Sequence, residues 1–327
     1  MSALQDQPLT IVFLDRDTLS PETTLKPINY PHRLVTHSRT RPEEVAERIA
    51  DADIVIVNKV PVREDALAGA RRLKLVALSA TGTDNVDVKA ANGRGITVSN
   101  IRNYAGHTVP EHTFALILAL QRNILAYRDS VKAGRWQEAG QFCYFDYPIK
   151  GLAGSTLGII GDGVLGKAVA DLGRAFGMKV LFSDYKGSTG MGPLYTPFDE
   201  VMRVSDVITL HLPLMASTRD LVGEREFALM ERRPILVNTA RGGLVNEDAL
   251  HAALTSGKIS GAGFDVVTKE PPELDSPLMR LLELPNFILT PHVAWASQDA
   301  IQGLADQLVD NINAFIGGAP RNVVVPM

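Results

Sequence analysis

The stretch that decides the fold is LGIIGDGVLGKAVA, residues 157–170. An apolar run with the composition of a buried strand leads into Gly161, Gly163 and Gly166, and a helical pattern follows at once. Glycines at this spacing allow a tight turn, a close approach of the backbone to a pyrophosphate, and close packing of helix on strand. The unpaired N–H groups at the start of the helix favour bound phosphate. The stretch therefore predicts a dinucleotide-binding unit.

The next strand-like run supports this interpretation. The run KVLFSD ends in Asp184, whose carboxylate can accept hydrogen bonds from the ribose hydroxyls of an adenosine and would repel a 2′-phosphate. NAD is therefore expected rather than NADP, although Lys186 lies nearby and weakens that preference. A glycine-rich turn without a nucleotide is less favoured, because strand, glycines, helix, strand and terminal acid follow in order.

Strand-like runs and helical patterns alternate on both sides of this stretch. TIVFL, DIVIVN, LKLVALS and GITVSN precede it, and five further runs follow, up to NFILTPH. A long helical pattern over residues 108–134 separates the two series. Such alternation predicts parallel sheets with helices on both faces. We expect two Rossmann-like, doubly wound domains: a nucleotide-binding domain of residues 103–296, inserted into a discontinuous substrate domain of residues 1–102 and 297–327.

Composition narrows the class of protein. The chain has 327 residues, of which 45% are hydrophobic and 21% charged, which is ordinary for a globular protein. A net charge of −4 gives no indication of a nucleic-acid or membrane partner. The single cysteine, Cys143, excludes an internal disulfide and predicts a reducing, cytoplasmic location. The start MSALQDQPLT lacks the features of a signal peptide, the run FALILAL is too short to span a bilayer, and no metal site is expected.

Ionisable groups follow three of the predicted strands. Arg241 follows ILVN, Asp265 and Glu270 follow GAGF, and His292 follows FILT. In open α/β sheets, ligands bind beyond the carboxyl ends of the strands, so these groups are expected to converge beside the nicotinamide. Each of them alone is more simply a structural residue, but their joint placement favours a catalytic site.

The chemistry of these groups is complementary. Reduction of a ketone needs a hydride on carbon, which a dinucleotide supplies, and a proton on oxygen, which a protonated His292 can supply. A neighbouring Glu270 would favour the charged ring and fix its orientation. Arg241 can hold a substrate carboxylate or carbonyl oxygen and stabilise developing negative charge. His211 is expected near the cofactor without a catalytic role, and the other histidines are assigned mostly to structure.

With these residues the chain resembles the D-2-hydroxyacid dehydrogenases over nearly its whole length. The motifs that carry the resemblance are LSATGTDNVD, GHTVPEH, LGIIGDGVLG, HLPL, VNTARGGLVNEDAL, GFDVVTKEPP and LTPHVAWAS. The resemblance implies that Arg241 binds substrate, Glu270 supports the histidine, and His292 is the proton donor. It also implies that Asp265 contacts the nicotinamide amide.

The resemblance implies further binding residues. Lys59 and the backbone of Ala80, Thr81 and Gly82 would bind the substrate carboxylate. The expected cofactor contacts are Thr108, Gly161, Gly163, Val164, Leu165, Gly166, Asp184, Leu212, Pro213, Thr218, Thr239, Ala240, Arg241, Asp265, His292 and Trp295. One departure is Val164, where many relatives have an arginine or lysine. Phosphate binding is therefore expected to rest on backbone N–H groups.

Within the family, the chain looks most like the glycerate dehydrogenases, also called hydroxypyruvate reductases, in NKV, RWQEAGQFCYFDYPIKGLAG and HVAWAS. This implies reversible, NADH-dependent reduction of hydroxypyruvate, and of glyoxylate, to the D-2-hydroxy acid. Lactate-, phosphoglycerate- and erythronate-type substrates stay open, as does a non-catalytic NADH-sensing scaffold. The family forms homodimers through the nucleotide-binding domain. Trp136 or Phe142 would then either reach a neighbouring subunit's active site or pack in the interface.

Overall fold

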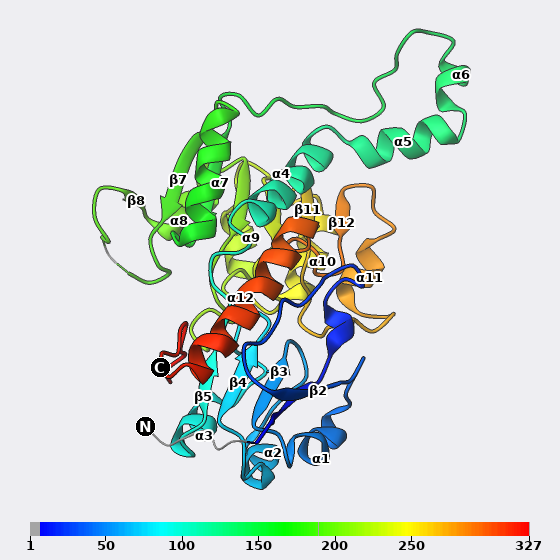
Figure 1. Ribbon diagram of the computed structural model, residues 1–327. Helices are drawn as coiled ribbons and strands as arrows, with labels where there is room; N and C mark the ends of the chain where they lie inside the picture. The colour runs from blue at the N-terminus through cyan, green and yellow to red at the C-terminus, as the bar shows by residue number, and fades with distance from the viewer. Residues whose placement is uncertain (1–6, 189, 327) are drawn as a thin grey trace. The chain divides into compact units, whose positions relative to one another are not determined.

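The computed structural model describes residues 7–188 and 190–326. Residues 1–6, on which the expectation of no signal peptide partly rests, and Met327 lie outside the described residues. The chain divides into two compact units (Figure 1). The first unit consists of Met1–Tyr104 and Ala296–Met327, and the second unit is Ala105–Trp295.

The first unit contains a five-stranded parallel sheet in the order β2-β1-β3-β4-β5. Its strands are β1 (Leu9–Phe13), β2 (His32–Thr36), β3 (Ile54–Val57), β4 (Leu75–Leu78) and β5 (Thr97–Ser99). Its helices are η1 (Arg16–Thr18), η2 (Pro42–Glu44), α1 (Val45–Ile49), α2 (Glu64–Gly69), α3 (Val88–Gly93) and α12 (Gln298–Ile316). The chain therefore returns to this unit at its C-terminal end, where α12 packs near β4.

The second unit contains a seven-stranded parallel sheet in the order β12-β11-β10-β9-β6-β7-β8. Its strands are β6 (Thr156–Ile160), β7 (Lys179–Ser183), β8 (Tyr195–Thr196), β9 (Val207–Leu210), β10 (Ile235–Asn238), β11 (Gly261–Phe264) and β12 (Phe287–Leu289). Its helices are α4 (Thr108–Gln121), α5 (Ile124–Lys132), α6 (Arg135–Ala139), α7 (Val164–Ala175), α8 (Phe198–Val204), α9 (Glu224–Leu229), α10 (Glu247–Thr255) and α11 (Pro277–Leu281). The predicted fold class of two parallel α/β domains is confirmed.

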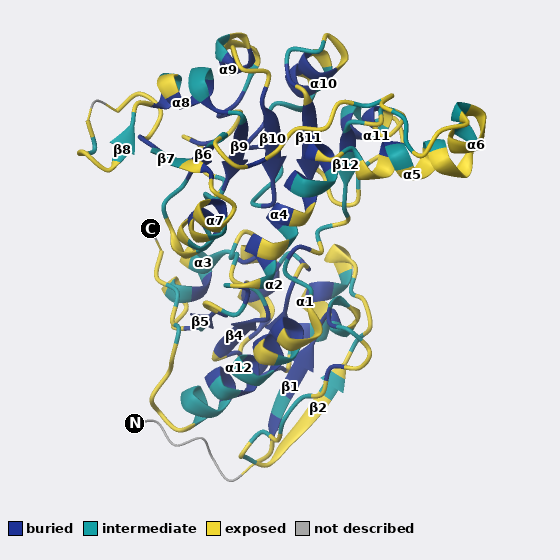
Figure 2. Cartoon of the chain, turned by 90° about the horizontal axis from the view of Figure 1, so that it is seen from above, coloured by how far each residue is buried: buried dark blue, intermediate teal, exposed yellow. Residues whose placement is uncertain are grey.

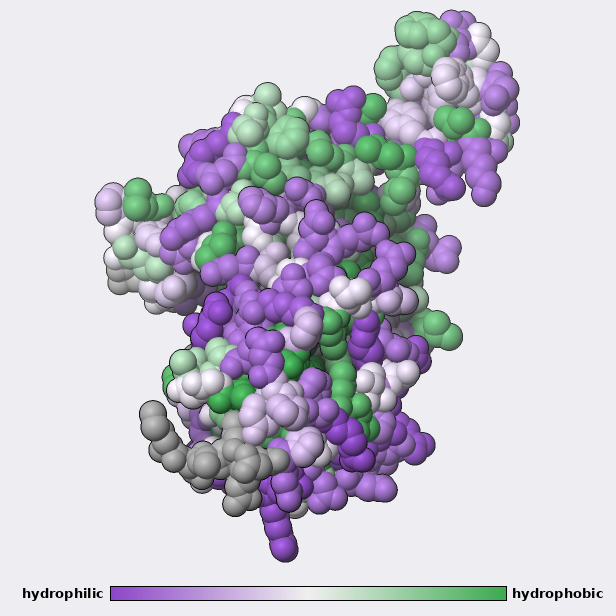
Figure 3. Space-filling view, viewed as in Figure 1, coloured by the Kyte–Doolittle hydropathy of each residue, from purple (hydrophilic) through white to green (hydrophobic). Residues whose placement is uncertain are grey.

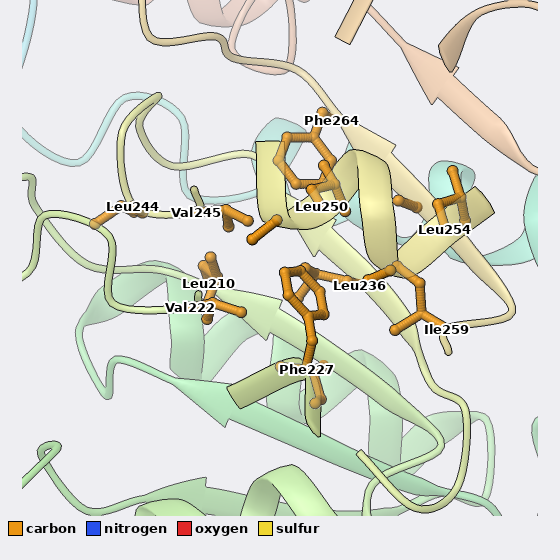
Figure 4. Packing of buried hydrophobic residues seen from close by; sticks show 14 of the residues in the cluster. Leu210, Val222, Phe227, Leu236, Leu244, Val245, Leu250, Leu254, Ile259 and Phe264 are labelled. Atoms are coloured by element: carbon orange, nitrogen blue, oxygen red, sulfur yellow. The ribbon is translucent and has the colours of Figure 1, made fainter. Parts of the chain in front are cut away.

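Helices cover both faces of the second sheet, and strand periodicity divides the core accordingly. Along β10, Val237 packs in a cluster with Phe114 of α4 and Val169 of α7, whereas its neighbour Leu236 packs in a cluster with Phe227 of α9. Successive side chains of a strand point to opposite faces, so a strand covered on both faces must be apolar throughout. The strands β9, β10 and β11 are buried at every position (Figure 2), and Figure 4 shows the cluster on the α9–α10 face.

The long helical pattern over residues 108–134 is divided into two helices, α4 and α5. The α4 helix ends at Gln121, and Asn123 adopts a left-handed conformation with φ of +50° before α5 begins. Asparagine tolerates this region better than most residues do. The α5 and α6 helices extend away from the sheet of the second unit as an arm (Figure 1).

The described residues offer neither a membrane-spanning helix nor a cluster of metal ligands. No helix in that part of the chain combines the length and apolar character needed to cross a bilayer. No group of three or more histidine, cysteine or acidic side chains within it could hold a metal ion.

Candidate active site

The strand order of the second unit creates a switch point between β6 and β9. From β6 the chain continues to β7 on one side, and β9 starts the series that runs to β12 on the other. Ligands of open α/β sheets bind at the carboxyl edge beside such a point. The residues that directly follow β6, β9, β10, β11 and β12 are Gly161, His211, Thr239, Asp265 and Thr290.

The glycine turn after β6 is shaped for a close backbone approach. Gly161 has φ of +106°, and a Cβ there would lie 2.3 Å from the carbonyl oxygen of His211. A Cβ on Gly166 would lie 2.0 Å from the carbonyl oxygen of Gly161, so the turn itself requires both glycines. A Cβ on Gly163, the residue before α7, would meet nothing within 4 Å. The turn therefore leaves open space at the helix start, and a pyrophosphate fits these residues.

His211 packs its backbone against this turn and keeps its ring neutral. Its Nε2 lies 2.9 Å from the hydroxyl of Thr209, and its Nδ1 is buried without a hydrogen-bond partner in the described residues. Burial lowers the pKa of His211 to about 4. Buried polar atoms normally have a partner, so an unpartnered ring nitrogen on a residue whose backbone meets the glycine turn fits a site that receives a polar ligand.

Asp184 follows β7, as the ribose-binding residue of such a fold does. Asp184 is only 4% exposed, and its Oδ1 accepts a hydrogen bond from the N–H of Met191 at 3.1 Å. Its own N–H donates to the carbonyl oxygen of Thr196, so the backbone of Asp184 is held against β8. Val164, at the first position of α7, is 61% exposed.

His292 and Glu270 form the pair that the sequence predicted. The Nδ1 of His292 lies 2.7 Å from Oε2 of Glu270, and the two side chains are 23% and 34% exposed. His292 has φ of +55°, which is uncommon for a residue with a side chain, and its N–H donates to the carbonyl oxygen of Asp265 at 2.8 Å. Backbone strain at a reactive side chain is a frequent feature of functional sites.

The loop after His292 is anchored on both sides. Trp295 donates its indole N–H to the carbonyl oxygen of His292 at 3.0 Å, and Thr108 of α4 donates its hydroxyl to the carbonyl oxygen of Ala294 at 3.2 Å. Both residues were predicted from the resemblance as cofactor contacts. In the structure they also fix the backbone that carries the histidine.

Arg241 lies in the loop after β10. The side-chain amide of Asn238 donates to the carbonyl oxygen of Arg241. The guanidinium of Arg241 donates to the carbonyl oxygen of Ala240 at 2.7 Å. A Cβ on Gly242 would lie 1.9 Å from the carbonyl oxygen of Val267. The backbone of the loop that contains Arg241 therefore lies in close contact with the segment that leads to Glu270.

The other predicted cofactor contacts follow β9 and β10. The Thr218 hydroxyl donates to the carbonyl oxygen of Pro213 at 2.8 Å and closes the loop that follows Leu212. The Thr239 hydroxyl lies 2.9 Å from that of Thr113 on α4. Both bonds use the side-chain hydroxyls of predicted cofactor contacts and hold them against the protein's own structure.

The first unit places Lys59 after β3 and Ala80 after β4, which are neighbouring strands. The loop of Ala80, Thr81 and Gly82 is tied to Ile101, which donates its N–H to Ala80 and accepts the Thr81 hydroxyl at 2.7 Å. The predicted substrate-binding residues of this unit therefore lie on one sheet edge.

Two features of the site were not predicted from the sequence. Asp15 is 3% exposed and accepts the N–H groups of Asn58, Lys59 and Val60, which fixes the loop of Lys59. Burial raises the pKa of Asp15, and the hydrogen bonds from those three N–H groups lower it by less, so the pKa lies above its ordinary value. His112, which we assigned to structure, lies 3.0 Å from the hydroxyl of Thr290 beside Asp265. The position of Asp15 directly after the strand-like run TIVFL is the sequence signal from which its place at this sheet edge could have been predicted.

A doubly wound sheet with this turn at its switch point, and with arginine, acid and histidine on neighbouring strand ends, defines a nicotinamide-dinucleotide dehydrogenase domain. Comparisons with known proteins define the family. The profile of the D-isomer specific 2-hydroxyacid dehydrogenase NAD binding domain matches residues 114–294. The chain belongs to this family of NAD-dependent oxidoreductases, and the predicted family and cofactor are confirmed.

Three similar proteins illustrate the match. A glycerate dehydrogenase of Methylorubrum extorquens is 53% identical over 315 residues, which are 96% of this chain and 98% of that protein. A hydroxypyruvate reductase of Blautia hydrogenotrophica is 37% identical, with 97% and 99% of the two chains covered. The solved D-lactate dehydrogenase of Aquifex aeolicus, in complex with NAD and lactic acid, is 30% identical with a TM-score of 0.81, and 97% and 99% are covered.

Proposed function

We propose that the protein catalyses the reversible, NADH-dependent reduction of hydroxypyruvate to D-glycerate, and of glyoxylate as a weaker substrate. The observation that carries the catalytic part is the 2.7 Å contact between His292 and Glu270, at the sheet edge that also bears the glycine turn. The similarity to a glycerate dehydrogenase at 53% identity supports the substrate.

His292 is the proposed proton donor for reduction and the acceptor for oxidation. Glu270 holds Nδ1, so Nε2 is the ring nitrogen that exchanges a proton with the substrate oxygen. The carboxylate also stabilises the charged ring before the proton leaves. The bound nicotinamide supplies the hydride.

Arg241 is the proposed substrate-binding cation of the second unit. Its guanidinium can hold a carboxylate through two parallel bonds and stabilise charge that develops on the carbonyl oxygen. In the first unit we assign carboxylate binding to Lys59 and to the backbone N–H groups of Ala80, Thr81 and Gly82. The first unit is then the substrate domain and the second unit the nucleotide-binding domain.

The cofactor contacts are assigned to the edge residues described above, with the pyrophosphate on the glycine turn. Because Val164 is apolar, the backbone N–H groups at the start of α7 carry the phosphate interaction. Asp184 accepts the ribose hydroxyls and disfavours a 2′-phosphate, which supports NADH over NADPH.

The exposed apolar side chains of the α5–α6 arm and of the segment that follows it support a homodimer through the nucleotide-binding domain. Ile124, Trp136, Phe142 and Phe145 are 46–87% exposed, and Figure 3 shows hydrophobic surface on this arm. A second copy would cover them. Trp136 or Phe142 would then either enter the neighbouring active site or pack in the interface. The lone cysteine supports a reducing compartment, and we assign the enzyme to the cytoplasm.

The decisive experiment measures NADH consumption with hydroxypyruvate, glyoxylate, pyruvate and 3-phosphohydroxypyruvate in parallel, each repeated with NADPH. We expect the highest kcat/KM for hydroxypyruvate with NADH, and a lower value for glyoxylate. A higher value for another keto acid would reassign the substrate within the family. Tight NADH binding without turnover of any of the four would instead indicate a non-catalytic NADH-sensing scaffold.

A further inference from the structure

The segment after β7 carries opposing signals for cofactor choice. Residues 184–194 contain two charged side chains, Asp184 and Lys186. An acid at the ribose position disfavours the 2′-phosphate of NADPH, whereas a cation near it accommodates that phosphate. A lysine has a flexible four-carbon stem, so its position in the sequence does not determine where its charge lies.

The structure resolves where Lys186 makes its bonds. Its Nζ lies 2.9 Å from Oε1 of Glu226 on α9, and 2.9 Å from the carbonyl oxygen of Leu221 in the segment that leads into this helix. The ammonium also lies 5.8 Å from the ring centroid of Phe198 on α8. Lys186 is therefore tied to α8 and α9 rather than to the acid two residues before it.

Glu226 is built to hold a cation. Its side chain is 3% exposed, and it accepts the N–H of Gly223 at 3.0 Å and a guanidinium N–H of Arg225 at 2.9 Å. Burial raises the pKa of Glu226, yet the bonds from Lys186, Gly223 and Arg225 outweigh burial and leave that pKa below its ordinary value. The carboxylate is therefore charged at neutral pH, and a buried charge strongly disfavours the loss of a partner.

We propose that Glu226 is a positioning residue for cofactor choice: by holding Lys186 on α9, it leaves Asp184 as the charged group that meets the ribose. This inference deepens the proposed NADH preference and rests on it. Glu226 itself touches no cofactor in this account. It acts through Lys186, so its effect must vanish when the lysine is absent.

Three variants and a matched control test this dependence. Glu226→Gln keeps the shape of the side chain and an acceptor for Gly223, but it removes the charge that holds Lys186. Lys186→Met removes the cation, and the double variant removes both. Glu224→Gln is the control, because it removes one acidic charge from an exposed position of the same helix.

The readout is the dissociation constant for NADH and for NADPH, measured by titration without substrate. Glu226→Gln should bind NADPH more tightly relative to NADH by roughly fivefold, as one added charge contact with a 2′-phosphate gives. Glu224→Gln should leave the ratio unchanged, and the double variant should return it to the wild-type value. A gain that persists in the double variant would overturn the proposal.

Lys186→Met alone provides a test that does not depend on the folding of Glu226→Gln. Because Lys186 is already held on α9, its removal should leave both dissociation constants within about twofold of wild type. A several-fold loss of NADPH affinity in this variant would mean that Lys186 already reaches the phosphate, which contradicts the proposal.

The outcomes also separate this inference from the proposed function. If the wild-type protein binds NADPH more tightly than NADH, the proposed cofactor preference fails whatever the variants do. If the wild type prefers NADH and Glu226→Gln leaves the ratio unchanged, the preference stands and only the role of Glu226 fails. Turnover of hydroxypyruvate enters neither result.

Discussion

The carboxylate of Asp265 accepts the N–H of Ala294 at 2.8 Å, from the second residue beyond His292. The same carboxylate accepts the N–H of Val293 at 2.9 Å and the hydroxyl of Thr290 at 2.6 Å. Asp265 is 1% exposed, so these bonds form away from solvent. The residue that the family resemblance assigns to the nicotinamide therefore also fixes the chain on both sides of the histidine.

Replacement of Asp265 tests this second role. In Asp265→Asn, an amide N–H₂ must face one of the donors that now reach the carboxylate. We expect a loss of about 1–3 kcal/mol in the free energy of unfolding, together with a lower kcat, because the φ of +55° at His292 loses its support. Urea unfolding and steady-state kinetics measure the two effects. Thr290→Val, which removes one donor, should show a smaller change, and equal stability of Asp265→Asn and wild type would refute the structural role.

The proton-transfer assignment predicts a separation of turnover from binding. His292→Gln should lower kcat by about 10²–10⁴-fold, the usual contribution of a general acid, with little change in NADH affinity. Glu270→Gln should lower kcat less, because the ring keeps a hydrogen-bond partner but loses the charge that stabilises its protonated form. Rapid-mixing turnover and NADH titration provide the measurements. A His292→Gln enzyme with near wild-type turnover would exclude this residue as the proton donor.

Two glycines of the turn should respond differently to one added methyl group. Gly163→Ala places the methyl in open space, so the protein should unfold at the wild-type temperature but bind NADH more weakly. Gly166→Ala forces the turn apart at Gly161 and should lose about 1–3 kcal/mol of stability. Thermal unfolding and NADH titration distinguish the two. If Gly163→Ala kept full NADH affinity, the backbone of this turn would not be the pyrophosphate site.

Much of this architecture could be predicted, because parallel strands covered on both faces must be apolar throughout. All six strand candidates of the second unit, from STLGIIG to NFILTPH, contain observed strands. The C-terminal segment pairs with the first sheet, with the N–H of Val324 donating to the carbonyl oxygen of Val98.

Other elements gave no such signal. The β2 strand, HRLVT, lies at a sheet edge with four of its five residues exposed, so it lacks a hydrophobic pattern. The β8 strand has two residues, too few for any periodicity. The contacts of Asp15 with residues 58–60, and of Lys186 with Glu226, join residues about 40 positions apart. Such pairings depend on tertiary packing, which no local pattern encodes.

The neutral ring of His211 predicts a pH dependence of stability. Burial lowers the pKa of His211 to about 4 in the folded protein, below the ~6.5 of an unfolded chain. Between these values the unfolded chain binds more protons, so stability should be full above pH ~6.5 and fall as the pH drops toward 4. The loss from this residue is at most about 3 kcal/mol. Urea unfolding between pH 4.5 and 7 should show a shallower decline in His211→Gln.

A partly exposed histidine of the same unit provides the control for this experiment. His251 lies on α10, and His251→Gln should leave the pH dependence of unfolding as it is in the wild type. If His211→Gln and His251→Gln had the same pH profile as the wild type, the decline would come from other groups, and the assignment of a neutral buried ring to His211 would be wrong.

Replacement of Asp15 should weaken substrate binding, although its carboxylate does not contact the substrate. Asp15→Ala leaves three N–H groups of the Lys59 loop without their acceptor, so the loop should loosen and the KM for hydroxypyruvate should rise several-fold, with a smaller change in kcat. Asp15→Asn, which retains one acceptor oxygen, should restore much of the loss.

The control for Asp15 is a second buried acid in the same sheet. Asp53 precedes β3 at the opposite end of that strand, where it accepts the N–H of Thr10 and pairs with Arg72 at 2.8 Å. Asp53→Ala should therefore lower stability while leaving KM unchanged, because the Lys59 loop keeps its acceptor. Steady-state kinetics beside urea unfolding separates the two positions. If both alanine variants raised KM equally, the effect would reflect general destabilisation of the first unit, and Asp15 would have no particular part in ordering the loop.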